Sequence, residues 1–218
     1  MSAPVYLILG GARSGKSAFA ERLARHLARP VLYLATATPG DPEMAARIAA
    51  HRAARPSDWR TVESPQALAE AVRRHARPGD TALVDCLTLW LSNLLVFRYR
   101  LPAEGEVVPE DTWREIEREA LQEIAGLIAA ARARDAALIL VSNEVGMGIV
   151  PSYPLGRRYR DLLGRVNQEA ARRADSVILV IAGLPIDLRG LVPEALRPLL
   201  TADAPDPRSD EQTGDRSR

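Results

Sequence analysis

The stretch from Gly10 to Ser17 constrains the fold of this chain more than any other feature. Its sequence, G-G-A-R-S-G-K-S, fills every fixed position of the phosphate-loop pattern G-x-x-x-x-G-K-[S/T]. The apolar run from Val5 to Leu9 suits a buried parallel strand, and Ser17 to Ala28 has helical spacing. A strand, a glycine turn and a helix N-terminus in this order direct backbone N–H groups and the helix dipole at an anion. The alternative is a chance glycine turn before a helix.

Lys16 is the only lysine among the 29 Lys and Arg residues of the chain. In a phosphate loop this lysine reaches the β- and γ-phosphates, and the hydroxyl of Ser17 holds Mg²⁺. A planar guanidinium would not replace the compact ammonium in so tight a turn. We therefore predict that Lys16 is catalytic and that the whole loop binds nucleotide, through Gly10, Gly11, Ala12, Arg13, Ser14, Gly15, Lys16 and Ser17.

Length and composition favour one cytoplasmic domain. The 218 residues suffice for a domain over 1–200, followed by a tail at 201–218 that lacks an apolar pattern and is expected to be disordered. A net charge of +1 argues against a dedicated nucleic-acid-binding protein. Cys86 is the only cysteine, which fits a reducing compartment, and neither a signal peptide nor a bilayer-spanning stretch is apparent.

Apolar runs alternate with helical patterns along the chain, which predicts an α/β fold of the P-loop NTPase type. We expect a mostly parallel, RecA-like sheet flanked by helices, with the site at the carboxyl ends of the strands. The expected strands lie at 5–9, 31–35, 59–62, 81–85, 137–141 and 176–181. The expected helices lie at 17–28, 42–55, 64–75, 87–98, 113–134 and 155–173.

Two further features are candidates for chemistry. Asp85 ends an apolar strand, as a Mg²⁺-binding Walker-B acid does, although aspartate also forms turns there. Arg47, His51 and Arg55 recur at i, i+4 and i+8 on the helix predicted at 42–55, so they would share one face. The arginines could bind a polyphosphate while the histidine attacks an α-phosphate. From this spacing alone, an ordinary solvated basic face is the more common explanation.

Two weaker signals lie further along the chain. Asn143 and Glu144 follow a buried strand directly, and Gly146 and Gly148 would let a ligand approach the backbone, unless the segment is a plain connection. The basic cluster at 157–160 could bind phosphate, but solvated helix charge explains it equally simply.

Several motifs follow one another along the chain. They are G-G-A-R-S-G-K-S at 10–17, A-T-A-T at 35–38, E-M-A-A-R-I-A-A-H-R-A-A-R-P at 43–56, W-R-T-V-E at 59–63, L-V-D-C-L-T at 83–88, N-E-V-G-M-G-I-V-P at 143–151 and G-R-V-N-Q at 164–168. Together they resemble one enzyme family, the bifunctional adenosylcobinamide kinase / adenosylcobinamide-phosphate guanylyltransferases of cobalamin biosynthesis. The likeness covers roughly residues 5 to 185, and the loop at 143–151 and the histidine helix are much more specific than the phosphate loop.

The resemblance implies two reactions and a set of site residues. ATP or GTP phosphorylates adenosylcobinamide, and GMP then passes from GTP to adenosylcobinamide phosphate through a transient GMP adduct on His51. It further implies a homotrimer that requires Mg²⁺, held by Ser17 and Asp85. Besides the phosphate loop, the resemblance assigns nucleotide binding to Ala35, Thr36, Ala37, Arg52, Ala53, Ala54, Arg55, Glu63 and Asp85.

Two other functions compete with this interpretation. One is a simple P-loop small-molecule kinase in which His51 has no role. The other is a nucleotide-gated regulatory or recombinase-like ATPase, against which the near-neutral charge already argues.

Overall fold

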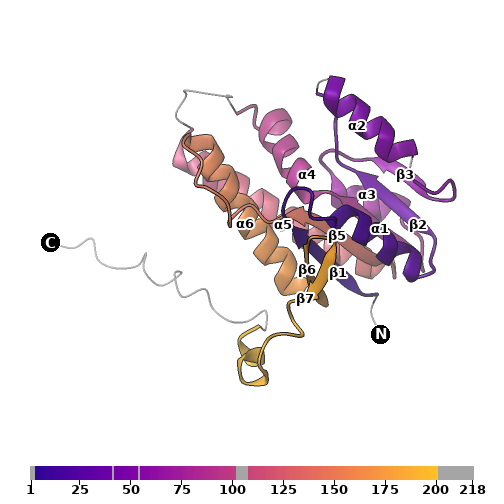
Figure 1. The fold of residues 1–218 in the computed structure, drawn as a ribbon. Helices are drawn as coiled ribbons and strands as arrows, with labels where there is room; N and C mark the ends of the chain where they lie inside the picture. The colour runs from indigo at the N-terminus through magenta and orange to yellow at the C-terminus, as the bar shows by residue number, and fades with distance from the viewer. Residues whose placement is uncertain (1–2, 41, 54, 102–107, 201–218) are drawn as a thin grey trace.

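The computed structural model describes residues 3–40, 42–53, 55–101 and 108–200. Within these ranges, seven strands form one sheet in the order β3-β2-β4-β5-β1-β6-β7 (Figure 1). The strands are β1 (Val5–Gly10), β2 (Val31–Ala35), β3 (Arg60–Glu63), β4 (Thr81–Asp85), β5 (Ala137–Asn143), β6 (Ser176–Ile181) and β7 (Leu184–Asp187). The helices are α1 (Lys16–His26), α2 (Pro42–Ala53), α3 (Leu68–His75), α4 (Leu87–Asn93), the π-helix η1 (Leu94–Arg98), α5 (Glu110–Ala133), α6 (Pro154–Arg173) and the short 3₁₀ segment η2 (Glu194–Leu200).

The sheet confirms the predicted mostly parallel, RecA-like architecture. β1 precedes the phosphate loop, β4 ends in Asp85, and β5 lies between these two strands. All pairings from β3 to β6 are parallel, and only β7 is antiparallel, to β6. β7 was not predicted from sequence. Ala182 and Gly183 join it to β6 with φ of 51° and 81°, as expected for a type I′ hairpin turn.

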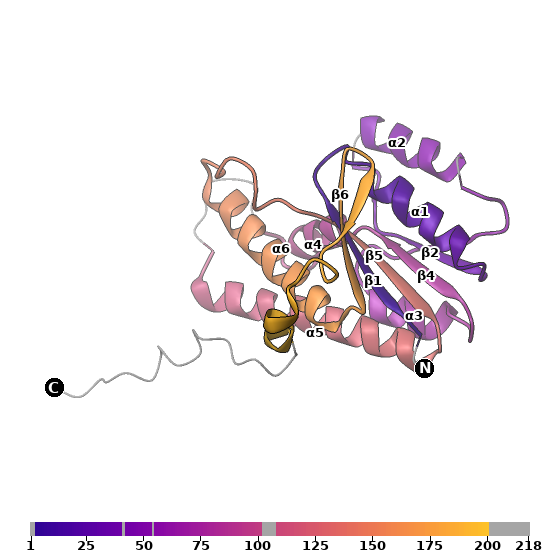
Figure 2. The same ribbon diagram turned by 60° about the horizontal axis from the view of Figure 1, so that its bottom comes forward.

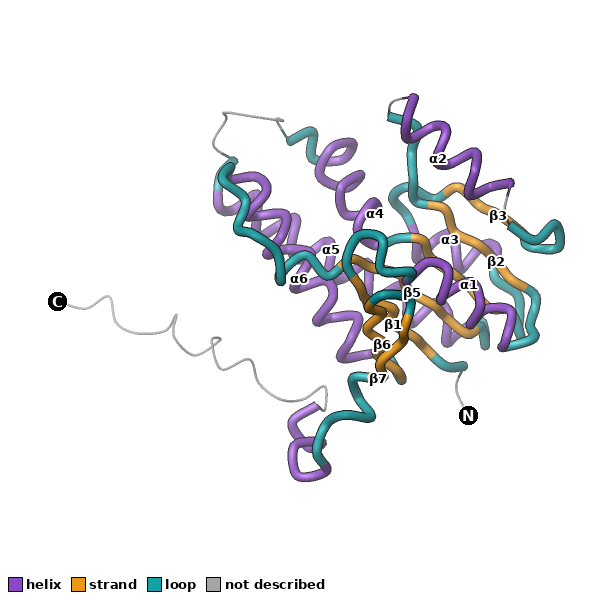
Figure 3. Tube along the Cα trace, in the orientation of Figure 1, coloured by secondary structure: helices purple, strands orange, loops and turns teal. Residues whose placement is uncertain are grey.

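Helices cover both faces of the sheet (Figure 2). Because side chains alternate along a strand, Leu7 of β1 faces the cluster that packs against α3, α4, α5 and α6, and Ile8 faces α1. The first cluster is much the larger, with Trp90, Ile116 and Ile124 nearly fully buried. The sheet is therefore buried in its centre, and its carboxyl ends are left to loops (Figure 3).

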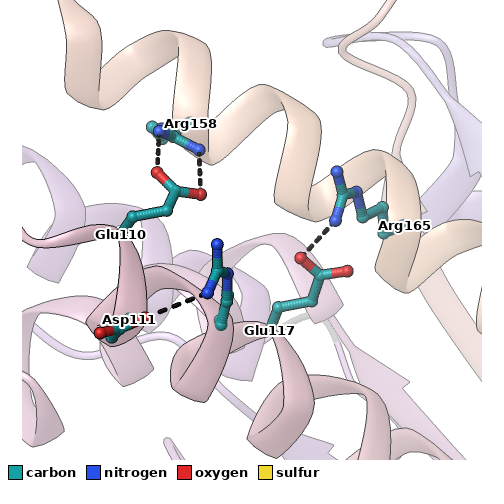
Figure 4. Close-up of polar contacts among 6 residues, drawn as sticks. Glu110, Asp111, Glu117, Arg158 and Arg165 are labelled. Carbon is teal, nitrogen blue, oxygen red and sulfur yellow. Dashed lines mark hydrogen bonds and ion pairs between the residues drawn. The ribbon is translucent and has the colours of Figure 1, made fainter. Parts of the chain in front are cut away.

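Charged side chains line the contact between α5 and α6 (Figure 4). Arg158 of α6 forms an ion pair with Glu110 of α5, and Arg165 forms one with Glu117. These exposed pairs are worth about 0–1 kcal/mol each, so the apolar cluster beneath them supplies most of the stability. Within the basic cluster at 157–160, Arg157 and Arg160 donate to backbone carbonyls of the loop before α6.

Some predicted boundaries were wrong. α3 begins at Leu68 and not at residue 64, because Trp90 and Asn93 donate to the carbonyls of Gln66 and Pro65 and hold this segment out of the helix. α2 ends at Ala53, so Arg55 lies past its C-terminus. The expected tail at 201–218 lies outside the described residues. No helix in the described ranges has the length and apolarity needed to cross a bilayer.

Candidate active site

The phosphate loop joins β1 to α1 with a backbone that its sequence permits. Gly15, directly before α1, has a φ of 91°, which favours glycine, and Arg13 has a φ of 60°. A Cβ on Gly10 would lie 2.4 Å from Ser14 Oγ and 2.7 Å from the carbonyl oxygen of Val180, so only glycine fits. Gly183 also donates its N–H to the carbonyl of Ser14 over 2.8 Å. The loop is thus held by its own glycines and by the β6–β7 turn.

Lys16 is the first residue of α1, and its Nζ donates to the carbonyl of Gly11 over 3.2 Å. The ammonium therefore lies within the loop that would surround a polyphosphate. Partial burial lowers the pKa of Lys16, an effect that the nearby Cys86 and Asp85 oppose. Binding of phosphate oxygens would supply the counter-charge that this partly desolvated lysine needs.

Asp85, at the end of β4, connects the phosphate loop to β2. Its Oδ1 lies 3.4 Å from the donor Ser17 Oγ, and its Oδ2 accepts a 2.7 Å hydrogen bond from the hydroxyl of Tyr33. Burial, and secondarily the negative charge of Asp85, raise the pKa of Tyr33 far above its usual value, so this hydroxyl remains a donor. A hydroxyl and a carboxylate side by side fit Mg²⁺, which takes oxygen ligands and keeps part of its coordination for phosphate and water.

A cavity of about 270 Å³ joins the phosphate loop to the histidine helix. His51 and Arg52 reach it from the last turn of α2, and Lys16, Ser17 and Asp85 line it from the sheet side. Its full lining is Lys16, Ser17, Tyr33, Ala35, Ala37, Ile48, His51, Arg52, Arg55, Glu63, Asp85, Cys86, Thr88, Leu89 and Asn143. The imidazole and the phosphate-loop lysine thus share one cavity, although they lie 35 positions apart in the sequence.

The arginines that follow His51 are held in two different ways. Arg52 pairs with Glu63 of β3 over 2.5 Å, and both side chains are exposed. Arg55 places its guanidinium carbon 3.7 Å from the ring centre of Tyr33, close enough for a cation–π contact. Its Nε is buried and has no hydrogen-bond partner among the described residues. An anion in the cavity would satisfy this donor.

Other predicted binding residues lie around the cavity and not in its lining. Thr36 is fully buried; its hydroxyl donates to the carbonyl of Cys86 and accepts from the N–H of Cys86, so it fixes the β2 end against β4. Ala53 is exposed at the end of α2, and Ala54 lies outside the described residues. The phosphate-loop residues before Lys16, which are Gly10, Gly11, Ala12, Arg13, Ser14 and Gly15, contribute backbone to the loop and are absent from the lining.

Sequence reasoning missed several lining residues, among them Tyr33, Ile48 and Leu89. Tyr33 looks like an ordinary strand residue, and nothing in the sequence distinguishes its hydroxyl. Cys86 also lines the cavity, but burial, reinforced by Asp85, raises the pKa of its thiol to about 11. A thiol that stays protonated is a poor nucleophile, so His51 is the better nucleophile candidate in this cavity.

Asn143, expected on the rim of the site, lies in its wall. It ends β5 beside Gly10, its partner in the register with β1. Its N–H donates to Thr88 Oγ1 over 2.9 Å, and its carbonyl accepts from Asn167 Nδ2 over 3.0 Å. Its side-chain oxygen is buried and has no partner within the part of the chain that the structure describes. The backbone of Asn143 is fixed by these two hydrogen bonds, and its side-chain oxygen still lacks a donor among the described residues.

Known proteins match this chain over most of its length. The model of the cobinamide kinase / cobinamide phosphate guanyltransferase family matches residues 6–188. The bifunctional adenosylcobalamin biosynthesis protein CobP of Pseudomonas aeruginosa is 50% identical over 184 residues, covering 84% of this chain and 96% of that protein. CobU of Escherichia coli K12, which bears the same description, is 44% identical over 184 residues, covering 84% of this chain and 98% of that protein. Among solved structures, the RadB recombinase aligns with 82% of this chain and 75% of its own, at 15% identity and a TM-score of 0.45.

Proposed function

Since this chain belongs to the cobinamide kinase / cobinamide phosphate guanyltransferase family, we propose that its two reactions share the cavity between the phosphate loop and α2, and that His51 carries the guanylyl group. The enzyme phosphorylates adenosylcobinamide and then guanylylates the product in cobalamin biosynthesis. The observation that carries the proposal is that His51 and Lys16 line one cavity.

The kinase reaction requires a nucleoside triphosphate held by its β- and γ-phosphates. The acceptor hydroxyl oxygen forms a bond to the γ-phosphorus, the bond from that phosphorus to the β–γ bridging oxygen breaks, and the hydroxyl proton leaves to solvent. Lys16 and the loop N–H groups neutralise the charge on the phosphates, and the fixed loop positions them. Mg²⁺, held by Ser17 and Asp85, would supply further charge neutralisation.

The guanylyl transfer requires attack at the α-phosphorus of GTP. An imidazole nitrogen of His51 forms a P–N bond while the bond to the β-phosphate oxygen breaks and pyrophosphate leaves. The phosphate oxygen of adenosylcobinamide phosphate then forms a bond to the same phosphorus, and the P–N bond breaks to give adenosylcobinamide-GDP. Arg52 and Arg55 line the same cavity as His51, which supports a role for them in binding the nucleotide phosphates.

The test follows the label from [α-³²P]GTP in the absence of a corrinoid. The wild-type chain should acquire an acid-labile, base-stable adduct, and His51→Ala should acquire none. His51→Ala should also lose conversion of adenosylcobinamide phosphate by at least about 10³-fold, because the nucleophile is gone, while retaining the kinase reaction.

His26 and His75 provide matched controls, because both are exposed on other helices. His26→Ala and His75→Ala should label like the wild type. If His51→Ala labels normally and converts adenosylcobinamide phosphate at full rate, the histidine mechanism is refuted and only the kinase remains.

Three finer points belong to the same proposal. We expect Mg²⁺ dependence in both reactions, a homotrimer, and action in the cytoplasm, where ATP and GTP are made. The assembly is tested by light scattering, which should give three times the chain mass. Removal of Mg²⁺ with EDTA should abolish both reactions and its return should restore them.

A further inference from the structure

A second, larger cavity lies beside the nucleotide cavity. It has a volume of about 760 Å³, within the range typical of small-molecule sites. Its walls come from α4 and η1 on one side and from the loop and first turns of α6 on the other, and they are mostly apolar. Lining residues include Leu95, Val96, Val145, Ile149, Tyr159 and Arg160. Ile149 is 96% exposed and Val96 is 53% exposed, so this apolar wall is open to a ligand.

Among the described residues the two cavities share no lining residue, but hydrogen bonds and short segments of chain connect their walls. Tyr159 lines the larger cavity, and its hydroxyl donates over 2.8 Å to the carbonyl of Thr88, which lines the smaller one. The hydroxyl oxygen of Thr88 also accepts a hydrogen bond from the N–H of Asn143. Val145, two residues after Asn143, lines the larger cavity. Thr88 of α4 and Leu95 of η1 lie seven residues apart along two consecutive helices, which is roughly 10 Å at the rise of an α-helix. A ligand in the larger cavity could therefore extend an arm past Thr88 to the phosphates.

We propose that this larger cavity binds the macrocycle of the corrinoid acceptor and that the acceptor's hydroxyl-bearing arm crosses the wall formed by Thr88, Asn143 and Tyr159. The inference rests on the proposed function, which requires the hydroxyl and later its phosphate to meet a nucleotide beside Lys16 and His51. A corrinoid is a broad, largely apolar ring with amide groups at its edge and one flexible arm. An apolar cavity with one polar neighbour site matches that chemistry.

Two unpartnered polar atoms support the match. Arg160 donates from Nη2 to the carbonyl of Gly146 over 3.0 Å, but its Nη1 is buried and lacks a partner among the described residues. A peripheral amide carbonyl of the corrinoid would accept from this nitrogen. At the other end of the path, the unpartnered Oδ1 of Asn143 would accept from the hydroxyl of the arm. Each end of the ligand would thus meet a buried polar atom that lacks a hydrogen-bond partner in the described part of the chain. Left unsatisfied, such an atom destabilises the folded protein.

The test places a charge on each wall of the cavity and measures cobinamide binding. Ile149→Asp and Val96→Asp alter exposed side chains, so both variants should fold. Because a carboxylate opposes burial beneath an apolar ring, each variant should raise the KM for cobinamide and its Kd in equilibrium dialysis by at least about tenfold. The KM for the nucleotide and the yield of GMP adduct on His51 should not change.

Met147→Asp is the matched control, because Met147 is 83% exposed on the same loop and does not line the cavity. It should bind cobinamide like the wild type. Unchanged cobinamide constants in both cavity variants, or an equal loss in Met147→Asp, would overturn the inference. So would a change of mass in light scattering in either cavity variant, which would mean that a second copy of the chain covers the cavity. Failure of the proposed function is distinct, because the wild type itself would then form no adduct.

Discussion

Tyr33 holds Asp85 in position through the 2.7 Å hydrogen bond from its hydroxyl, while Asp85 also lies beside Ser17. The tyrosine ring in turn contacts the guanidinium of Arg55 and stacks with Trp59, whose ring centre lies 6.2 Å away. Under the proposed function, Ser17 and Asp85 would hold Mg²⁺, and Tyr33 would act as a positioning residue because its hydrogen bond fixes the carboxylate of Asp85.

Tyr33→Phe should leave the fold nearly intact and weaken the binding of Mg²⁺. Loss of one hydrogen bond to a charged group costs roughly 1.5–3 kcal/mol, which predicts an increase of about ten- to a hundredfold in the Mg²⁺ concentration for half-maximal activity. Mn²⁺ binding followed by electron paramagnetic resonance in the presence of GTP checks this without relying on turnover. Tyr6→Phe, on β1 and outside the cavity lining, should not alter Mn²⁺ binding. Equal Mn²⁺ affinity in Tyr33→Phe and the wild type would contradict the role.

The role of some residues could be predicted from the sequence and that of others could not, for a physical reason. Lys16 and Ser17 belong to a local pattern that reports its own geometry, since loop and helix are continuous in the chain. Asp85 was predicted separately, from its place at the end of an apolar strand. His51 was ambiguous from spacing alone, and only the resemblance favoured a role for it. Tyr33 and Thr88 act through partners from distant segments, and no local pattern encodes such contacts.

At the scale of elements, Asn93 joins three segments near the site. Its Nδ2 donates to the carbonyls of Thr36 and Pro65, and its Oδ1 lies 3.4 Å from Thr38 Oγ1. It thereby ties α4 to the end of β2 and to the segment before α3. The same two tertiary donors, Asn93 and Trp90, explain why the predicted helix start at 64 was wrong: they satisfy carbonyls that a longer helix would have used.

Asn93→Ala should destabilise the protein by about 2–3 kcal/mol, because buried carbonyls lose their donor in a site that is only 7% exposed. Urea unfolding followed by circular dichroism should show a lower midpoint with an unchanged m-value. Ser92→Ala, the neighbouring change on the same helix, should cost much less. A midpoint equal to that of the wild type would show that the three segments do not depend on Asn93.

At the scale of the whole molecule, the strand order was only partly predictable. Alternating strands and helices predict a mostly parallel sheet, and the strands at 31–35, 81–85 and 176–181 have the expected bounds. The insertion of β5 between β1 and β4 depends on which strands pair at long range, which residue patterns do not specify. That insertion is what brings Asn143 into the cavity wall.

Because the phosphate loop joins the sheet to α1, nucleotide binding should stabilise the whole fold. At a concentration of MgGTP one hundred times its Kd, linkage predicts about 2.7 kcal/mol of added stability. Lys16→Ala should lose most of this gain, since the phosphates lose their ammonium. Thermal unfolding with and without MgGTP measures the difference, and the melting temperature without nucleotide is the internal control. An undiminished shift in Lys16→Ala would show that the nucleotide binds elsewhere.

The two border strands of the sheet are both short, and this has a consequence for behaviour in concentrated solution. β3 and β7 span four residues each; β3 carries Arg60 and Glu63, and β7 contains Pro185, which has no N–H to offer. The free edge of a border strand is a template on which strands of other chains can add by backbone hydrogen bonding. A short strand, charged side chains and proline all discourage such addition. Both edges of the sheet therefore disfavour the addition of strands from other molecules, and with it the formation of filaments or aggregates.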